Sequence, residues 1–174
     1  MTPDLKDKRV LLLGAETELG RAIAGALAES GARLALVGAT NDAETSFAVQ
    51  RLGRKQAAEV SQAIDATNDM AVRVMVRQVS KALGGLDAVV FAVLPDMSRE
   101  RGEAALGIAL RFAGRELSRT QGNFIIVWHP KLGVPAIPIP DGQWWIGLLD
   151  LEDFSTESAA AGVIDHLARF GASE

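Results

Sequence analysis

The chain has 174 residues, of which 48% are hydrophobic and 23% charged, and its net charge is −4. This length accommodates one full core, and the acidic balance excludes the basic footprint of a nucleic-acid-binding protein and a polybasic membrane patch. Because the chain has no cysteine, disulfides, thiolate metal sites and cysteine nucleophiles are excluded as well.

Short apolar runs alternate along the chain with segments of helical periodicity. In chain order, the predicted elements are strand Arg9–Leu13, helix Leu19–Ser30, strand Arg33–Val37, helix Thr45–Arg54, strand Glu59–Ile64, helix Asp69–Leu83, strand Leu86–Val93, helix Met97–Arg119, strand Asn123–Trp128, strand Trp144–Leu149 and helix Ser155–Phe170, capped by Ser155. Residues 130–142 hold four of the six prolines and are therefore predicted as a loop.

This alternation predicts an α/β fold with helices on both faces of a mostly parallel sheet. We expect one Rossmann-like, doubly wound domain over residues 1–174, with about six strands in the order 3-2-1-4-5-6. The N-terminal residues lack the features of a signal peptide, and no apolar run approaches the roughly 20 residues that span a bilayer. The prediction is a cytoplasmic protein that binds neither membrane nor nucleic acid.

A glycine-containing turn joins the first strand to the first helix, with the sequence Gly14-Ala-Glu-Thr-Glu18-Leu-Gly20. It is followed at fold-compatible distances by Asp65-Ala-Thr-Asn, Gly85-Leu-Asp-Ala-Val-Val and Gly122-Asn-Phe-Ile-Ile-Val. Together these segments resemble the short-chain dehydrogenase/reductase family over residues 6–129, with residues 130–174 divergent. The resemblance implies a Rossmann fold, NAD(P) as the ancestral cofactor, oligomers built through long helices, and cofactor-binding positions at Gly14, Glu18, Leu19, Gly20 and Asp65.

Carboxylates stand in this turn where the cofactor phosphates are expected. Glu18 occupies the position of the family's middle glycine, which lets the backbone approach the pyrophosphate, and Glu16 adds a second carboxylate. Two like charges about 4 Å apart repel by about 4 kcal/mol at an effective dielectric constant of 20. We therefore predict no bound cofactor, or NAD(P) if any. The alternative is that Glu18 points outward and leaves binding intact.

The other nucleotide-contacting positions are equally atypical. Gly38-Ala-Thr follows the second strand, so neither an acidic residue for NAD nor an arginine for NADP is visible there. Asp65 matches the family's adenine-side Asp but is equally well interpreted as a helix cap or turn residue. The apolar segment Phe91–Leu94 replaces the family's Asn-Asn-Ala-Gly, which either narrows the cofactor space or simply ends a buried strand.

The family's general acid is a tyrosine followed four residues later by a lysine, and this chain contains no tyrosine. The expected position, near residues 142–146, reads Gly-Gln-Trp-Trp-Ile, and indole cannot supply a proton there. The proline-rich loop takes the place of the helix that carries this tyrosine. His129 falls where the family has its catalytic serine and is the only weak catalytic candidate, since no partner is evident. Two histidines with scattered acids give no metal-ligand spacing.

Two segments are candidate interfaces. Gly102, Gly107 and Gly114 share one predicted helix, whose equivalent in the family lies in the subunit interface, so they form either an oligomer seam or a close contact with the protein's own sheet. Trp144 and Trp145 would point to opposite faces of a strand, which gives either one exposed interface anchor or a strand buried under the last helix.

The absent tyrosine and the acidic turn predict a non-catalytic, structural or regulatory subunit, either a homo-oligomer or a heteromer with an active relative. Two alternatives remain. One is an NAD(P)-dependent oxidoreductase with unusual catalytic residues, using His129, and the other is a module that binds a nucleotide or small ligand without turnover.

Overall fold

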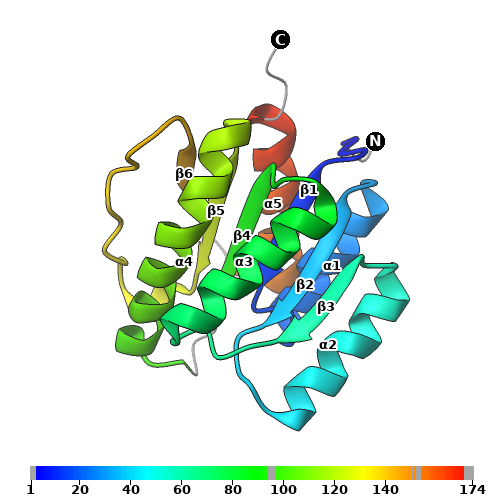
Figure 1. Ribbon diagram of the computed structural model, residues 1–174, viewed down its shortest axis with the longest axis horizontal. Coiled ribbons are helices and arrows are strands. Elements are labelled where there is room, and N and C mark those ends of the chain that lie inside the picture. The colour runs from blue at the N-terminus through cyan, green and yellow to red at the C-terminus, as the bar shows by residue number, and fades with distance from the viewer. Residues whose placement is uncertain (1–2, 94–96, 150, 152–153, 171–174) are drawn as a thin grey trace.

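The computed structural model of the chain describes residues 3–93, 97–149, 151 and 154–170. Strands and helices alternate along it, as the apolar periodicity predicts (Figure 1). In order, the elements are β1 (Arg9–Leu13), α1 (Glu18–Glu29), β2 (Arg33–Gly38), α2 (Ala43–Gln56), β3 (Val60–Ala63), α3 (Asp69–Leu83), β4 (Ala88–Val93), α4 (Arg99–Thr120), β5 (Asn123–Trp128), a 3-10 turn at Pro130–Leu132, β6 (Trp145–Leu148) and α5 (Thr156–Phe170). Each predicted element is present, with ends that differ by no more than a few residues.

The six strands form one parallel sheet in the order β3-β2-β1-β4-β5-β6, which confirms the predicted topology. Leu11 of β1 lies opposite Ala35 of β2 on one side and Val89 of β4 on the other. The chain order reverses between β1 and β4, so their carboxyl ends flank the crevice where such folds bind ligands. The turn after β1 opens into this crevice.

Helices cover both faces of the sheet (Figure 1). A layer of buried apolar side chains lies between the sheet and the helices on each face. One layer lies under α3 and α4 and includes Phe124, while the other lies under α1, α2 and α5 and includes Ile23. Every residue of β5 is buried. Helices cover both faces of the central strands, which is why these strands are apolar without alternation.

Polar side chains cap the helices at their first turns, where backbone N–H groups lack partners. Each capping oxygen accepts a hydrogen bond from the backbone amide three residues after the cap. These pairs are Thr17 with Gly20, Asp42 with Thr45, Asn68 with Ala71, Ser98 with Arg101, and Ser155 with Ser158. Ser155 is the cap that the sequence predicts. α2 begins at Ala43, two residues before the predicted Thr45, because the Asp42 carboxylate caps the helix as well as a serine hydroxyl would.

The two adjacent tryptophans separate at the β6 edge of the sheet. Trp144 precedes the strand and is only 7% exposed, whereas Trp145 begins β6 and is 54% exposed. A Cβ on Gly114 of α4 would lie 2.7 Å from the Trp144 ring, so this glycine makes room for the chain's own indole. Gly107 has no atom within 4 Å of a Cβ placed on it. Of the glycines in the predicted oligomer seam, Gly114 therefore contacts the protein's own Trp144, whereas the space beside Gly107 is unoccupied.

A bidentate ion pair joins the start of β1 to the residue that precedes β4. Arg9 Nε and Nη2 each donate to an oxygen of Asp87 at 2.9 Å, and the Arg9 backbone N–H donates to the same carboxylate at 2.9 Å. Burial alone would raise the pKa of Asp87, but the hydrogen bonds and the charge of Arg9 hold that pKa below its ordinary value.

Replacing Asp87 with Asn is expected to lower the free energy of unfolding by about 2 kcal/mol at neutral pH, since Arg9 loses its paired charge. Because the pKa is lower in the folded state, the stabilisation is complete above the ordinary carboxyl pKa of about 4 and is lost as the pH falls below it. Urea unfolding of the native protein and Asp87→Asn should therefore differ near pH 7, and the difference should shrink as the pH falls through the lowered pKa of Asp87 in the folded state. A difference that stays the same as the pH falls would contradict the role of this ion pair.

Candidate functional site

The turn after β1 depends on two glycines for its shape. Gly14 has a φ of +100°, and a Cβ on it would lie 2.5 Å from the backbone oxygen of Ala92 in β4. Gly20 lies in the first turns of α1, where a Cβ would come 2.2 Å from the backbone oxygen of Gly14. The helix therefore packs directly on the turn. These are the roles expected of the first and third glycines of a dinucleotide-binding turn.

The N-terminus of α1 is capped by a hydroxyl and not by a carboxylate. Thr17 Oγ1 accepts from the Gly20 N–H at 2.9 Å and donates to the Gly14 carbonyl at 3.1 Å. Glu18 is exposed as the first residue of the helix, and its φ is not positive, so its backbone does not require glycine. Leu19 is buried in the core below. The exposure of Glu18 agrees with the outward-pointing alternative, and whether the turn binds a cofactor stays a prediction.

Glu16 is the acidic residue that crosses to the neighbouring strand. Its two carboxylate oxygens lie 3.3 and 3.2 Å from the backbone nitrogen of Ala39, the first residue after β2, which donates to them. An open cavity of about 290 Å³ adjoins this contact and is also lined by Thr40, Ala92 and Arg101. An anionic ligand in this cavity would meet both the Glu16 carboxylate and the Arg101 side chain.

Asp65 lies in a turn after β3 and outside this cavity. Its Oδ1 accepts from the Thr67 hydroxyl at 2.6 Å and from the Thr67 backbone amide at 2.9 Å, and these bonds lower its pKa. The turn role therefore accounts for Asp65, and the cap of α3 is Asn68. At the end of β4, Phe91 is buried against Phe124, and Leu94 lies outside the described residues.

The family model described as enoyl-(acyl carrier protein) reductase matches residues 14–100, which is half of the chain. The matched region begins at the glycine turn and runs through β4 to the start of α4. The chain belongs to the short-chain dehydrogenase/reductase family. Among curated proteins, none matches the chain significantly.

Solved members of the short-chain dehydrogenase/reductase family share this architecture. A short-chain type dehydrogenase/reductase from Mycobacterium marinum is 26% identical, with a TM-score of 0.59 over 78% of this chain and 59% of that one. A short chain dehydrogenase from Burkholderia cenocepacia, in complex with NADP, is 25% identical, with a TM-score of 0.58 over 72% of this chain and 57% of that one. The protein gox2181 has the same fold at 20% identity, with a TM-score of 0.61 and coverages of 94% and 65%. The chain thus spans between 57% and 65% of the length of these three proteins.

In this family member, the connection from β5 to β6 contains one 3-10 turn at Pro130–Leu132 and otherwise no helix. Residues 142–146, near which the resemblance places the catalytic tyrosine, run from a bend at 141–143 into the start of β6. The Trp144 indole there is buried against α4. This stretch therefore carries no group that can exchange a proton with a substrate at neutral pH.

His129 follows β5 and contacts its own loop. Its Nδ1 accepts from the Lys131 backbone amide at 3.2 Å, and its ring lies 4.7 Å from the ring of Phe154. No carboxylate bonds to it in the described part of the chain. The other histidine, His166, belongs to α5 and packs on Gly147 of β6, where burial lowers its pKa. Within the described ranges, no three acidic or histidine side chains come together as a metal site.

An arginine and a glutamate at the start of α4 hold the proline-rich loop. Arg99 Nε pairs with Glu103 at 3.0 Å, while Arg99 Nη2 donates to the Val134 carbonyl at 2.8 Å. Glu103 in turn accepts from the Ala136 amide at 3.4 Å. Two side chains of α4 are therefore bonded to each other and to two backbone groups of the proline-rich loop, which holds the loop against α4.

Replacing Arg99 with Ala should open the loop without unfolding the sheet, because both the ion pair and the bond to Val134 are exposed. Loss of about 1 kcal/mol of local stability should raise the rate of proteolytic cleavage near Lys131 about fivefold. Limited trypsinolysis followed by mass spectrometry measures this rate, with Arg119→Ala at the other end of α4 as the control. Equal cleavage rates of both variants and the native protein would show that the contacts of Arg99 do not restrain the loop.

Sequence reasoning identified the turn and its two carboxylates but missed the Ala39 amide that bonds to Glu16 and the Arg101 side chain at the cavity. The contact of Glu16 with Ala39 joins residues 23 positions apart, and Arg101 comes from the N-terminal turn of a different helix. The only available signal was that β1 and β2 are neighbours in the predicted strand order, which places the loops after both strands together.

No described helix combines the length and the apolar character required to cross a membrane.

Proposed function

We propose that this chain is a non-catalytic member of the short-chain dehydrogenase/reductase family that acts as a structural or regulatory cytoplasmic subunit. It associates with itself or with an active relative and binds neither nucleic acid nor membrane. The observation that carries the proposal is the β5–β6 connection, where a clamped proline-rich loop stands in place of a tyrosine-bearing helix, in a chain without any tyrosine.

The chemical reason is the missing proton. Hydride transfer between a carbonyl and an alcohol requires a group that gives or takes a proton at the substrate oxygen. His129 is the remaining candidate, but its Nδ1 already accepts a backbone hydrogen bond, and no described carboxylate orients the ring. A proton donor without a positioned partner contributes little to catalysis.

Exposed apolar side chains near the β6 edge support a role in association. Trp145 and Leu148 of β6 are exposed, and the adjoining loop presents Val134 and Ile139, the latter 93% exposed. A tryptophan on an edge strand is a favoured interface anchor, and an edge strand also offers unpaired backbone groups. The open surface around Gly107 of α4 is a second candidate seam.

Titration with NADP(H) and NAD(H), followed by tryptophan fluorescence and calorimetry, tests the proposal when combined with light scattering. We expect no binding at micromolar concentrations and no turnover, together with a stable dimer or a co-purifying relative. Trp145→Asp should shift the assembly to the monomer, whereas Met70→Asp, an exposed apolar residue on α3, should not. Turnover of a carbonyl substrate, or a monomer at all concentrations, would contradict the proposal.

A nucleotide- or ligand-binding role, with or without oxidoreductase activity, is the second candidate. It is favoured by the cavity beside the turn, which Arg101 lines, and by the two glycines that shape the turn itself. The Burkholderia relative is described in complex with NADP, so NADP(H) is the first ligand to test. Micromolar NADP(H) binding without turnover would select a binding module, and binding with turnover that His129→Gln abolishes would select an unusual oxidoreductase.

A further inference from the structure

Two rows of basic side chains run along the neighbouring helices α3 and α4, and none of these side chains lines the cavity beside the glycine turn. Residues four apart in a helix lie on one face, so each row forms a stripe. The rows are Arg73, Arg77 and Lys81 on α3, and Arg111, Arg115 and Arg119 on α4. All six are exposed, in a chain whose net charge is −4.

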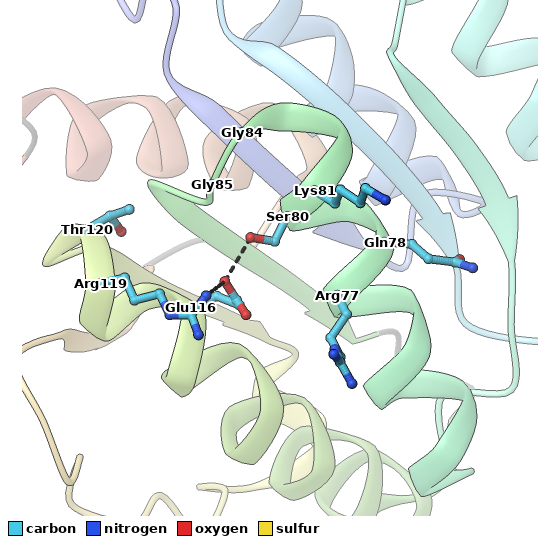
Figure 2. A pocket seen from close by; sticks show the side chains of 9 residues that line it. All are labelled: Arg77, Gln78, Ser80, Lys81, Gly84, Gly85, Glu116, Arg119 and Thr120. Carbon is cyan, nitrogen blue, oxygen red and sulfur yellow. Dashed lines mark hydrogen bonds and ion pairs between the residues drawn. The ribbon is translucent and has the colours of Figure 1, made fainter.

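A groove lies between the two rows. It consists of two adjoining hollows of about 620 and 200 Å³, which share Arg77, Glu116 and Arg119. Five of the six basic residues line it, and Glu116 is its one carboxylate among the described lining residues. Figure 2 shows the larger hollow, with Arg77 and Lys81 projecting from α3 and Arg119 from α4.

The positive charge of the groove is largely unbalanced. Glu116 accepts from the Ser80 hydroxyl at 2.8 Å and pairs with Arg119 at 3.5 Å (Figure 2), which links the two helices. Arg111 pairs with Asp69 at 2.7 Å. The other four basic side chains form no ion pair within the described chain. Like charges at this spacing destabilise a helix, so the fold itself gives no reason for the rows.

The groove also has an aromatic floor. Phe112 lines the smaller hollow together with Val76. The guanidinium carbons of Arg111 and Arg115 lie 4.9 and 5.7 Å from the centroid of the Phe112 ring. Cation–π contacts of this kind hold the basic groups beside the ring before any partner arrives.

We propose that this groove binds an acidic amphipathic helix of a partner protein. Such a helix would place apolar side chains on Phe112 and its carboxylates against the basic rows, which is helix-in-groove recognition. An open groove along a helix pair does not enclose a small ligand as a pocket must. The proposal does not depend on the loss of catalysis, because no groove residue lies in the glycine turn or its cavity.

A labelled synthetic helix of about five turns, with a leucine ridge flanked by glutamates, tests the proposal by fluorescence anisotropy at low salt. Two control peptides accompany it, one with glutamine in place of glutamate and one with the same residues in a non-amphipathic order. The protein variant is Arg73→Gln with Arg77→Gln. The matched control is Arg51→Gln with Arg54→Gln, which removes two charges from exposed positions of α2.

We expect the acidic amphipathic peptide to bind the native chain more tightly than either control peptide. The α3 variant should weaken this binding roughly tenfold and the α2 control by less than about twofold. Circular dichroism of both variants verifies that the helices remain folded. The proposal is overturned if the peptide does not bind, if both variants weaken binding equally, or if the reordered peptide binds as tightly. Tighter binding of tripolyphosphate or oligonucleotide at the same arginines, or filling of the groove by a second copy on sizing, would also overturn it.

Discussion

Gly20→Ala is expected to lower the free energy of unfolding by about 2–3 kcal/mol, although alanine favours a helix more than glycine does. The added methyl group would sit 2.2 Å from the Gly14 backbone oxygen and 2.7 Å from the Ala15 Cα, which are backbone atoms that cannot move aside independently. Urea unfolding followed by tryptophan fluorescence measures the change. The expected loss follows from the direct packing of α1 on the turn.

The same substitution at Gly107 is the matched control. Gly107 also lies inside a helix, but a Cβ there meets no atom within 4 Å. Gly107→Ala should therefore raise the free energy of unfolding by up to about 1 kcal/mol. Equal stability of Gly20→Ala and the native protein would show that α1 does not press on the turn. Weakened self-association of Gly107→Ala, at unchanged monomer stability, would place Gly107 in an oligomer seam.

Glu16→Gln combined with Glu18→Gly is expected to raise the affinity for NADP(H) at least roughly tenfold, because both carboxylates of the turn are removed. Most of the gain should come from Glu16, which is half-buried beside the cavity, since water screens the exposed Glu18. Glutamine retains an oxygen that can accept from the Ala39 amide, so the link to β2 survives. Calorimetric titration of the double variant and both single variants gives the comparison.

Glu29→Gln provides the charge control for this experiment. It removes one carboxylate from the exposed C-terminal end of α1, away from the turn, and should leave the affinity unchanged. The gain of the double variant should also shrink as salt is added, because screening weakens the repulsion in the native turn. Tight NADP(H) binding by the native chain, or no gain in the double variant, would contradict an electronegative turn.

The pattern of apolar residues located the strands of the sheet. A buried central strand appears in the sequence as a short uninterrupted apolar run, whereas a helix shows apolar residues three or four positions apart. The predicted first and last residues of helix Asp69–Leu83 and strand Asn123–Trp128 are the ones that the structure shows, since glycines and caps mark the ends of these elements. Trp144 was placed in the last strand but lies before it. Tryptophan is a common strand residue, so the sequence did not separate Trp144 from Trp145. The ring of Trp144 packs under α4 because Gly114 has no side chain there.

At the candidate site, the sequence predicted the turn glycines and the missing tyrosine and placed Glu18 at the middle-glycine position, but it did not show which of the two carboxylates lines the cavity. Glu16 and Glu18 are two residues apart and chemically identical. The start of α1 decides between them, since Glu18 becomes its exposed first residue while Glu16 reaches the amide after β2. The likeness of their side chains gave no means of separating them.

The amino-acid sequence by itself predicted the strand order, because strands and helices alternate regularly along the chain. It also determined the two glycines that the turn requires and the absence of a phenolic proton donor, because these depend on local geometry and composition. Tertiary structure alone decided which carboxylate faces the cavity, that the proline-rich loop is held by Arg99 and Glu103, and that two basic rows face one groove. These features join residues far apart in the chain, so they depend on how helices pack against a sheet and not on any pattern within one segment.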